Sequence, residues 1–340
     1  MNQIKVAIIG VGRIGRLHAE NLVKRIKNVK VEAVADINQE AAARCAQELG
    51  ISKFFQYSAP VFADPSIEAV LICTPTASHG ELIIEAARAG KHIFCEKPLA
   101  LTLEEIDQAL AAVEKSRVKF MVGFNRRFDP NFAKVRELIV KGAIGKPHLL
   151  RITSRDPALP PLAYLRQSGG IFIDMTIHDF DLARFLMGEE VVEIYATGSI
   201  LIDPVLTELG DIDTAVTVLH FASGAIGVID NSRRAVYGYD QRIEVFGERG
   251  MISVGNPAAD TSLLLTEKGL EGPTLPYFFI ERYTDSYIKE LEAFLDAIRE
   301  NREPPVTGKD ARISVVMAYA ANRSLKEKTP VRLKEIESFP

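Results

Sequence analysis

The sequence predicts an α/β chain with two parts: an N-terminal doubly wound parallel sheet, and a C-terminal α+β domain on a large, open, mostly antiparallel sheet. Three observations predict this class. Strand-like runs alternate with amphipathic helices in the first third, a glycine loop follows the first run, and the later strands are longer and separated by turns. With 340 residues the chain can hold two domains, which we place at residues 1–123 and 124–340.

The first domain is expected to alternate strands with helices. Apolar runs rich in β-branched residues predict strands at 4–9, 31–35, 69–73, 92–95 and 119–122. Helical periodicity predicts helices at 17–26, 41–49 and 81–89. Gly90 is placed to end the third helix, and Thr102 with Glu105 forms a capping box that opens another. Repeated strand and helix units of this kind are typical of a parallel, doubly wound sheet.

After Gly123 the pattern changes. Helices are expected at 132–140 and 170–187, a strand at 148–153, and two late helices at 286–299 and 309–325. Turn sequences at Ser223-Gly224 and Glu248-Arg249-Gly250 predict antiparallel hairpins. One face of such an open sheet needs a cover, either a helix or a partner subunit.

Composition excludes several classes of function. With 47% hydrophobic and 25% charged residues and a net charge of -4, the chain gives no electrostatic reason for a nucleic-acid or anionic-membrane partner. No apolar run reaches the roughly 18 residues that cross a bilayer, and the first residues lack the features of a secretion signal. The 3 cysteines show no CxxC spacing, so we expect no disulfide framework, no thiolate metal site and a cytoplasmic location.

The glycine loop Gly10-Val-Gly12-Arg13-Ile14-Gly15 lies between a strand and a helix, the context in which this motif binds a dinucleotide. Gly10 permits a tight turn, Gly12 lets a pyrophosphate approach, and Gly15 lets the helix pack on the strand. Arg13 is a candidate phosphate contact. Ile14, in the loop, and Thr74, which follows the strand at 69–73, are further candidate cofactor contacts. The alternative is a glycine turn in an unrelated α/β protein.

Asp36 ends the second strand, where a carboxylate can accept hydrogen bonds from the adenosine ribose. The same charge would repel a 2′-phosphate, and the next residues, Ile37 and Asn38, supply no cation. The sequence therefore favours NAD over NADP.

Glu96-Lys97-Pro98 follows a short strand, at the edge where open α/β sheets bind ligands. A lysine beside a nicotinamide can hydrogen-bond a substrate oxygen and stabilise the negative charge that develops on it. The alternative is a surface lysine paired with Glu96.

Asp174, His178 and Asp181 are spaced to line one face of a helix. Imidazole, with an ordinary pKa of about 6.5, suits a general base at neutral pH, and a neighbouring carboxylate would orient it. The alternatives are a divalent metal site and a helix surface with satisfied polar groups. The remaining histidines are interpreted as structural: His18, His79, His92, His148 and His220.

These segments resemble the Gfo/Idh/MocA oxidoreductase family and, within it, the bacterial inositol 2-dehydrogenases. The resemblance covers essentially the full length. The family resemblance rests on Gly10 to His18, Asp36, Glu96 to Leu99, Gly123 to Asp129, Gly169-Gly170, and Asp174 to Asp181. The inositol resemblance rests on Phe124 to Pro130 and Asn231 to Asp240.

The resemblance implies a Rossmann domain, NAD as cofactor, a cis Lys97-Pro98 bond, and a homotetramer in which open sheets pair. It also implies that Lys97, Asp174 and His178 are catalytic, and that Glu96 and Lys97 belong to the cofactor site. Implied substrate contacts are Lys97, Arg127, Asp156, Asp174, Thr176, His178, Tyr237 and Tyr283. Read without the family, Arg127 could equally form an ion pair and Tyr237 could be an interface aromatic.

The implied reaction is oxidation of a cyclic polyol, myo-inositol to 2-keto-myo-inositol (scyllo-inosose), with formation of NADH. His178 would remove the hydroxyl proton, Lys97 would hold the oxygen, and Asp174 would orient His178. Three alternatives stay open: a dehydrogenase of another inositol or sugar, a glycosidase that uses NAD transiently, and a non-catalytic NAD-sensing regulator. Lys97 and His178 fall in different predicted domains, so the reaction should need both domains.

Overall fold

The computed structural model describes residues 3–337, so the ends of the two predicted domains at residues 1 and 340 lie outside it. The chain forms two compact units, residues 1–128 with 285–313, and residues 129–284 with 314–340. The sequence predicts one boundary after residue 123, whereas helix α11 (Thr284–Arg299) lies almost wholly in the first unit. The reason is packing, since Phe294 of α11 lies 5.9 Å from Phe94, ring centre to ring centre.

The first unit is built on a six-stranded parallel sheet with the order β3-β2-β1-β4-β5-β6. Its strands are β1 (Ile4–Ile9), β2 (Val29–Ala35), β3 (Lys53–Phe55), β4 (Ala69–Ile72), β5 (His92–Cys95) and β6 (Phe120–Val122). The central strands are buried on both faces, which is why they read as continuous apolar runs. The order reverses between β1 and β4, and the predicted doubly wound Rossmann sheet is thereby confirmed.

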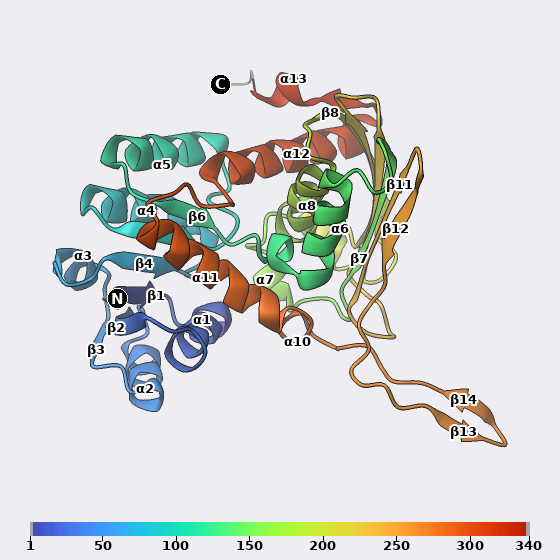
Figure 1. Ribbon diagram of the computed structural model, residues 1–340. Helices are drawn as coiled ribbons and strands as arrows, with labels where there is room; N and C mark the ends of the chain where they lie inside the picture. The colour runs from blue at the N-terminus through green and yellow to red at the C-terminus, as the bar shows by residue number, and fades with distance from the viewer. Residues whose placement is uncertain (1–2, 338–340) are drawn as a thin grey trace. The chain divides into compact units, whose positions relative to one another are not determined.

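Helices cover both faces of this sheet, with α1 and α2 on one side and α4 and α5 on the other (Figure 1). They are α1 (Arg13–Lys24), α2 (Gln39–Leu49), α3 (Ala59–Ala63), α4 (His79–Arg88) and α5 (Leu103–Ser116), with short 3₁₀ turns at η1 (Thr76–Ser78) and η2 (Asn125–Phe128). Thr102 caps α5, because its side chain accepts a hydrogen bond from the Glu105 N–H at 3.3 Å, which is one of the two bonds of the predicted capping box. Gly90 has φ +70°, the conformation expected where α4 ends.

The second unit contains a seven-stranded mixed sheet with the order β12-β11-β7-β10-β9-β8-β15. Its strands are β7 (Pro147–Arg155), β8 (Val191–Ser199), β9 (Thr214–Phe221), β10 (Ile226–Ser232), β11 (Asp240–Gly247), β12 (Gly250–Val254) and β15 (Val331–Arg332). Both predicted turns join antiparallel neighbours, β9 with β10 and β11 with β12. Only β7 and β10 pair in parallel among the described strands of this sheet, so the mostly antiparallel prediction is confirmed.

Helices lie on one face of this second sheet (Figure 1). The unit's helices are α6 (Pro130–Val140), α7 (Leu162–Leu165), the π-helix η3 (Phe172–Thr176), α8 (Ile177–Met187), α9 (Leu206–Leu209), α10 (Phe279–Arg282), most of α12 (Gly308–Glu327), and α13 (Leu333–Glu337). A small hairpin of β13 (Leu264–Thr266) and β14 (Gly269–Glu271) extends from the sheet. The opposite sheet face carries no helix in the described part of the chain.

No helix among residues 3–337 is both long and apolar enough to cross a membrane.

Candidate active site

The glycine loop is shaped by what lies around each glycine. A Cβ on Gly10, whose φ is +89°, would lie 2.7 Å from the Cys73 carbonyl carbon, and a Cβ on Gly15 would lie 1.9 Å from the Gly10 oxygen. Gly10 and Gly15 are therefore required by packing. Nothing lies within 4 Å of the corresponding position on Gly12. The chain leaves that side open, next to the N-terminal end of α1, which no side chain caps among the described contacts. A pyrophosphate fits this place.

Asp36 lies beside this loop, at the end of β2. Its Oδ2 accepts a hydrogen bond from the Val11 N–H at 2.8 Å, and its Oδ1 accepts one from the Asn38 N–H at 2.9 Å. The carboxylate is half-buried, and each oxygen keeps a second lone pair for a ribose hydroxyl. Ile37 beside it is 72% exposed and carries no charge. These residues fit the ribose of NAD and offer nothing to a 2′-phosphate.

Replacing Asp36 by serine should weaken NAD binding by about tenfold or more, because a charged acceptor for the ribose hydroxyls is lost. It should also reduce the discrimination against NADP. Titration of each nucleotide against protein fluorescence measures both quantities. Glu40→Gln, an exposed acid at the start of α2, is the matched control and should change neither. Unchanged nucleotide preference in the serine variant would remove the ribose role from Asp36.

The turn after β5 carries Glu96 and Lys97, and its Lys97-Pro98 peptide bond is cis, as the family resemblance implies. The buried His79 holds this turn. Its Nδ1 lies 2.8 Å from the Pro98 carbonyl oxygen and its Nε2 lies 2.8 Å from the Thr74 carbonyl oxygen. Burial lowers the pKa of His79, although both carbonyls favour the protonated ring. His79 thus links the loop after β4 to the half-buried Lys97.

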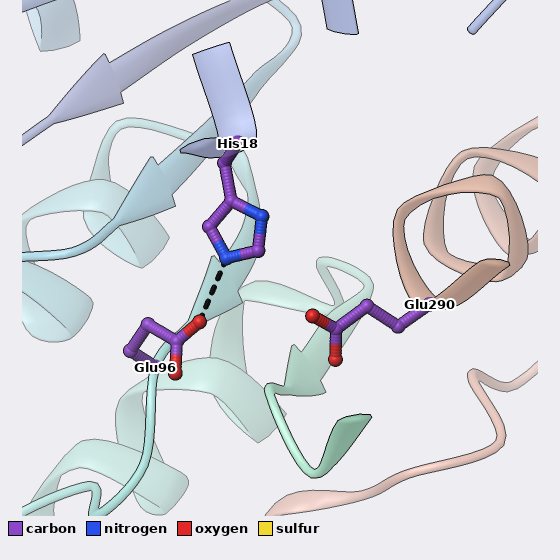
Figure 2. Close-up of side chains that lie close together, drawn as sticks. All are labelled: His18, Glu96 and Glu290. Atoms are coloured by element: carbon purple, nitrogen blue, oxygen red, sulfur yellow. Dashed lines mark hydrogen bonds and ion pairs between the residues drawn. The ribbon is translucent and has the colours of Figure 1, made fainter. Parts of the chain in front are cut away.

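Glu96 is paired with His18, one of the histidines interpreted above as structural. The buried His18 ring donates from Nε2 to Glu96 Oε1 at 2.7 Å (Figure 2). A Cβ on Gly123 would lie 3.1 Å from the Glu96 carboxyl group, so that glycine makes room for it. His18 therefore has a carboxylate partner, which its interpretation as a structural histidine did not include. The pair could not be predicted from the sequence, because α1 and β5 are far apart along the chain. The order of the strands in the sheet brings the two segments together.

Arg127 also lies in the first unit. It donates to the Pro305 carbonyl at 3.1 Å and forms an ion pair with Asp310 at 3.0 Å. Burial alone would raise the pKa of Asp310, but the Arg127 guanidinium and hydrogen bonds from Thr307 lower it to about 2. Arg127 therefore forms an ion pair within this unit, as the alternative interpretation expected. Its role as a substrate contact stays a prediction.

In the second unit, Asp174 and His178 are the half-buried residues of a segment that is otherwise buried from residue 171 to 183. They share an accessible face, whereas Asp181 is 1% exposed and does not belong to it. The expected regular helix is corrected here, since Phe172–Thr176 is π-helical. A π-turn inserts one residue and is frequent at functional sites. The sequence pattern could not show it, because α and π periods are close over five residues.

Both oxygens of Asp174 have donors. The Tyr164 hydroxyl donates to Oδ1 at 2.5 Å, and Arg233 Nη1 donates to Oδ2 at 2.9 Å. Arg233 is fully buried and also lies 3.6 Å from Asp211. Burial and the charge of Asp174 raise the pKa of Tyr164, which therefore remains a donor. Sequence reasoning missed both residues, since they come from distant segments.

Tyr164→Phe should lower kcat/KM about fivefold, because Asp174 loses the Tyr164 donor and a hydrogen bond to a charged group is worth at least about 1 kcal/mol. Steady-state kinetics with NAD and substrate measure this. Tyr57→Phe, a 60% exposed tyrosine of the first unit, is the control and should behave as the unchanged protein. Equal kinetics in the two variants would contradict a role for Tyr164.

Two of the predicted substrate residues are buried with partners. The Thr176 hydroxyl donates to Asn231 Oδ1 at 2.8 Å, and Asn231 in turn donates to Asp179 at 2.9 Å. The Tyr283 hydroxyl donates to Gln241 at 3.3 Å, and its side chain is 2% exposed.

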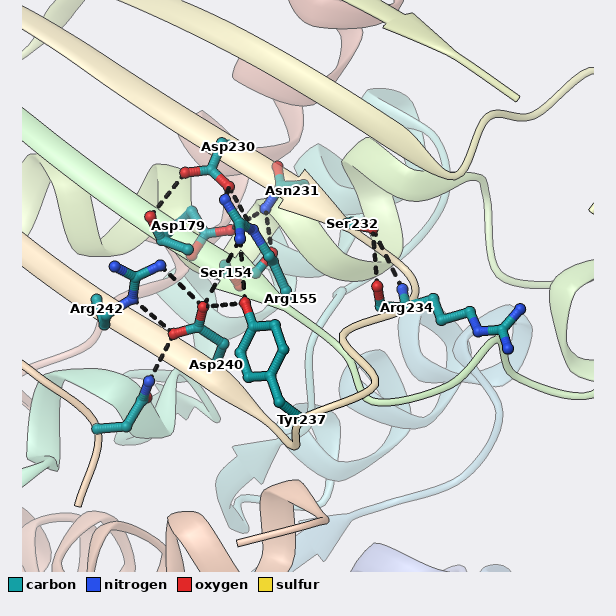
Figure 3. A network of polar contacts seen from close by, with 12 residues as sticks. Ser154, Arg155, Asp179, Asp230, Asn231, Ser232, Arg234, Tyr237, Asp240 and Arg242 are labelled. Carbon is teal, nitrogen blue, oxygen red and sulfur yellow. Dashed lines mark hydrogen bonds and ion pairs between the residues drawn. The ribbon is translucent and has the colours of Figure 1, made fainter. Parts of the chain in front are cut away.

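Two further predicted substrate residues, Asp156 and Tyr237, follow the ends of β7 and β10 in the sheet of the second unit. Asp156 is half-buried directly after β7, where its N–H donates to the Ser232 carbonyl at 2.9 Å. Tyr237 is 52% exposed. Its hydroxyl donates to Asp240 at 2.7 Å and accepts from Arg155 at 3.1 Å (Figure 3). Tyr237 thus belongs to a polar network near the ends of the inner strands β7, β10 and β11.

The open phosphate loop, the ribose carboxylate and the lysine at a strand end define the first unit as the nucleotide half of an NAD-dependent oxidoreductase. The chain belongs to the Gfo/Idh/MocA oxidoreductase family. The model of the family's NAD-binding Rossmann domain matches residues 4–124, and the model of its C-terminal domain matches residues 132–253.

Relatives of known activity cover nearly the whole chain. It is 50% identical to a myo-inositol 2-dehydrogenase of Thermotoga maritima over 98% of this chain and 99% of the relative. It is 44% identical to an inositol 2-dehydrogenase of Rhizobium meliloti over 97% and 99%. Among solved structures, a scyllo-inositol dehydrogenase from Lactobacillus casei with bound NAD(H) and scyllo-inositol superposes with a TM-score of 0.91 at 29% identity, over 98% and 99%.

Proposed function

We propose that the protein oxidises myo-inositol to 2-keto-myo-inositol with reduction of NAD. The observation that carries the proposal is the pair Asp174 and His178, which are accessible on an otherwise buried helical segment. A general base and a supporting carboxylate kept accessible in this way suit proton removal from an alcohol. The inositol dehydrogenases among the relatives support the choice of substrate.

In the proposed reaction, His178 accepts the hydroxyl proton of the substrate. Lys97 donates a hydrogen bond to the same oxygen and stabilises its developing negative charge. Asp174, held by Tyr164 and Arg233, presents a fixed carboxylate that orients His178. Bound NAD supplies the hydride acceptor, so that alcohol and NAD become ketone, NADH and one proton. The chemistry requires Lys97 and His178 to act on the same hydroxyl group.

The same proposal assigns NAD to Gly10, Gly12, Arg13, Ile14, Gly15, Asp36, Thr74, Glu96 and Lys97. Asp156 and Tyr237 offer polar atoms to the ring hydroxyls from partly exposed positions. Thr176 and Tyr283 are buried and each donate their one proton to a protein partner, and their contact with the substrate stays a prediction from the family resemblance. Arg127 has five N–H donors, and its contacts with Pro305 and Asp310 do not require all of them.

The test is NADH absorbance with purified protein across a panel of inositols and sugars, alongside direct measurement of NAD binding. We expect turnover with myo-inositol. Preference for scyllo-inositol, the ligand of the Lactobacillus casei relative, would change the isomer and keep the reaction class. Cleavage of a glycoside without NADH accumulation would replace the proposal by the glycosidase alternative. Tight NAD binding with no turnover would favour a sensor.

We propose further that the protein is a cytoplasmic homotetramer. The strand register puts four partly exposed apolar side chains on one face of this sheet: Tyr195, Val216, Ile226 and Phe246. A second copy packed on this face would cover them. The three free cysteines, Cys45, Cys73 and Cys95, suit a reducing compartment. Light scattering tests the tetramer, and cell fractionation tests the location.

A further inference from the structure

Three segments of the first unit bring ionisable side chains together in its interior. His18 comes from α1, Glu96 from the turn after β5, and Glu290 from α11. Their nearest nitrogen and oxygen atoms lie within 4.8 Å of one another. His18 and Glu290 are fully buried, and the Glu96 side chain is 14% exposed. Figure 2 shows the Glu290 carboxyl group directed from α11 toward the other two. We call these residues the buried triad.

Glu290 is the unusual member. Among the described residues, neither of its carboxyl oxygens has a hydrogen-bond partner. A charged carboxylate without a partner in a buried place loses several kcal/mol or more of hydration energy. The carboxylate of Glu96 nearby adds repulsion. Burial first, and then the charge of Glu96, raise the pKa of Glu290 well above its ordinary value. A protonated carboxyl group, in contrast, can donate a hydrogen bond.

The other groups facing Glu290 do not offer a compensating cation by ordinary pairing. Cys73, at the end of β4, interacts with Glu290, and burial raises the pKa of this thiol, which keeps it neutral. His18 already donates from Nε2 to Glu96. Its Nδ1 has no described partner. Of these three neighbours, Glu96 is therefore the one that offers Glu290 a negatively charged hydrogen-bond acceptor.

We propose that Glu290 is a positioning residue that remains a neutral carboxylic acid at neutral pH and, after a small side-chain movement, donates a hydrogen bond to Glu96, so that the buried triad acts as one hydrogen-bonded unit. The triad connects two parts of the nucleotide site. His18 follows Gly15 by one helical turn, and Glu96 directly precedes Lys97. Held from both sides, Glu96 fixes the turn that presents Lys97. Ionised Glu290 would push Glu96 away and disturb that turn.

The protonation state is tested by the pH dependence of stability. The folded chain keeps a proton on Glu290 that the unfolded chain releases above about pH 4.3, so this group weakens folding as pH rises until it also ionises in the folded state. Glu290→Gln keeps the shape and the donor but removes the titration. The ratio of its folding constant to that of the unchanged protein should therefore rise about tenfold per pH unit between about pH 5 and 7.

Urea unfolding followed by fluorescence measures this ratio. Glu292→Gln, an exposed acid on the same helix, is the control and should give a constant ratio. A constant ratio for Glu290→Gln would overturn the proposal. So would a loss of stability on removal of metal by a chelator, since the triad would then bind a divalent cation. If Glu290→Gln fails to fold, infrared spectra of the unchanged protein with ¹³C-labelled glutamate must show a protonated carboxyl band at pH 7, and its absence would overturn the proposal.

The positioning role is tested by kinetics and rests on the proposed function of Lys97. Glu290→Leu, which cannot donate, should lower kcat about tenfold or more with the KM for the polyol little changed, and Glu290→Gln should restore kcat. The unchanged protein should lose kcat at alkaline pH, and the glutamine variant should not. Equal kcat in all three proteins would overturn the positioning role. Failure of the proposed function would show differently, as an inactive unchanged protein whose stability ratio still rises with pH.

Discussion

Replacing His178 by alanine lowers kcat by about 10²-fold or more while NAD binding stays nearly unchanged. The reason is that the general base is lost, and positioned proton transfer contributes a factor of this size. His178 is not among the residues assigned to the nucleotide, so the affinity for NAD should change little. Steady-state kinetics and NADH fluorescence titration measure the two quantities separately.

His148→Ala is the matched control for this experiment, because His148 is an exposed histidine on β7 of the same unit. Its removal should leave kcat unchanged. Near-normal turnover in His178→Ala would contradict the assignment of the base. A fall in NAD affinity equal to the fall in kcat would indicate a structural role for His178 instead.

Lys97→Met should lower kcat by about 10² to 10³-fold, since the substrate oxygen loses the donor that stabilises its developing charge. Methionine keeps the apolar length of the side chain and removes the ammonium group. The measurement is kcat with saturating NAD and substrate. Arginine should not restore the rate, because a planar guanidinium does not replace a compact ammonium group at one oxygen.

Lys24→Met, at an exposed position in the last turn of α1, is the control for the lysine substitution. It should leave both kcat and NAD binding unchanged. If Lys97→Met weakened NAD binding alone and kept kcat, Lys97 would belong to the cofactor site without a role in the chemical step.

Most of the first unit could be predicted from local sequence. Strands β1 and β5 have the predicted bounds, because a buried parallel strand is a continuous apolar run. The roles of Gly10 and Gly12 were also readable, since the loop motif, the preceding strand and the following helix are contiguous. Asp36 followed from its place at the end of β2.

The division of the chain into two units could be predicted less well from the sequence. Helix α11 was expected in the second domain because it follows the second sheet in the sequence, yet it packs with the first unit. Amphipathic periodicity gives the apolar face of a helix and does not give the surface it covers. The π-turn before α8 was missed for a related reason, since a one-residue insertion changes the helical period only locally.

The sequence by itself determined the nucleotide fold, the preference for NAD, and the identities of Lys97, Asp174 and His178 as candidates. Each of these depends on residues that are neighbours along the chain. Only the tertiary structure decided which side chains support them. His79 holds the Lys97 turn, Arg233 and Tyr164 hold Asp174, and the buried triad joins α1, β5 and α11. These contacts join segments far apart in sequence, and no local pattern records which buried polar groups satisfy one another.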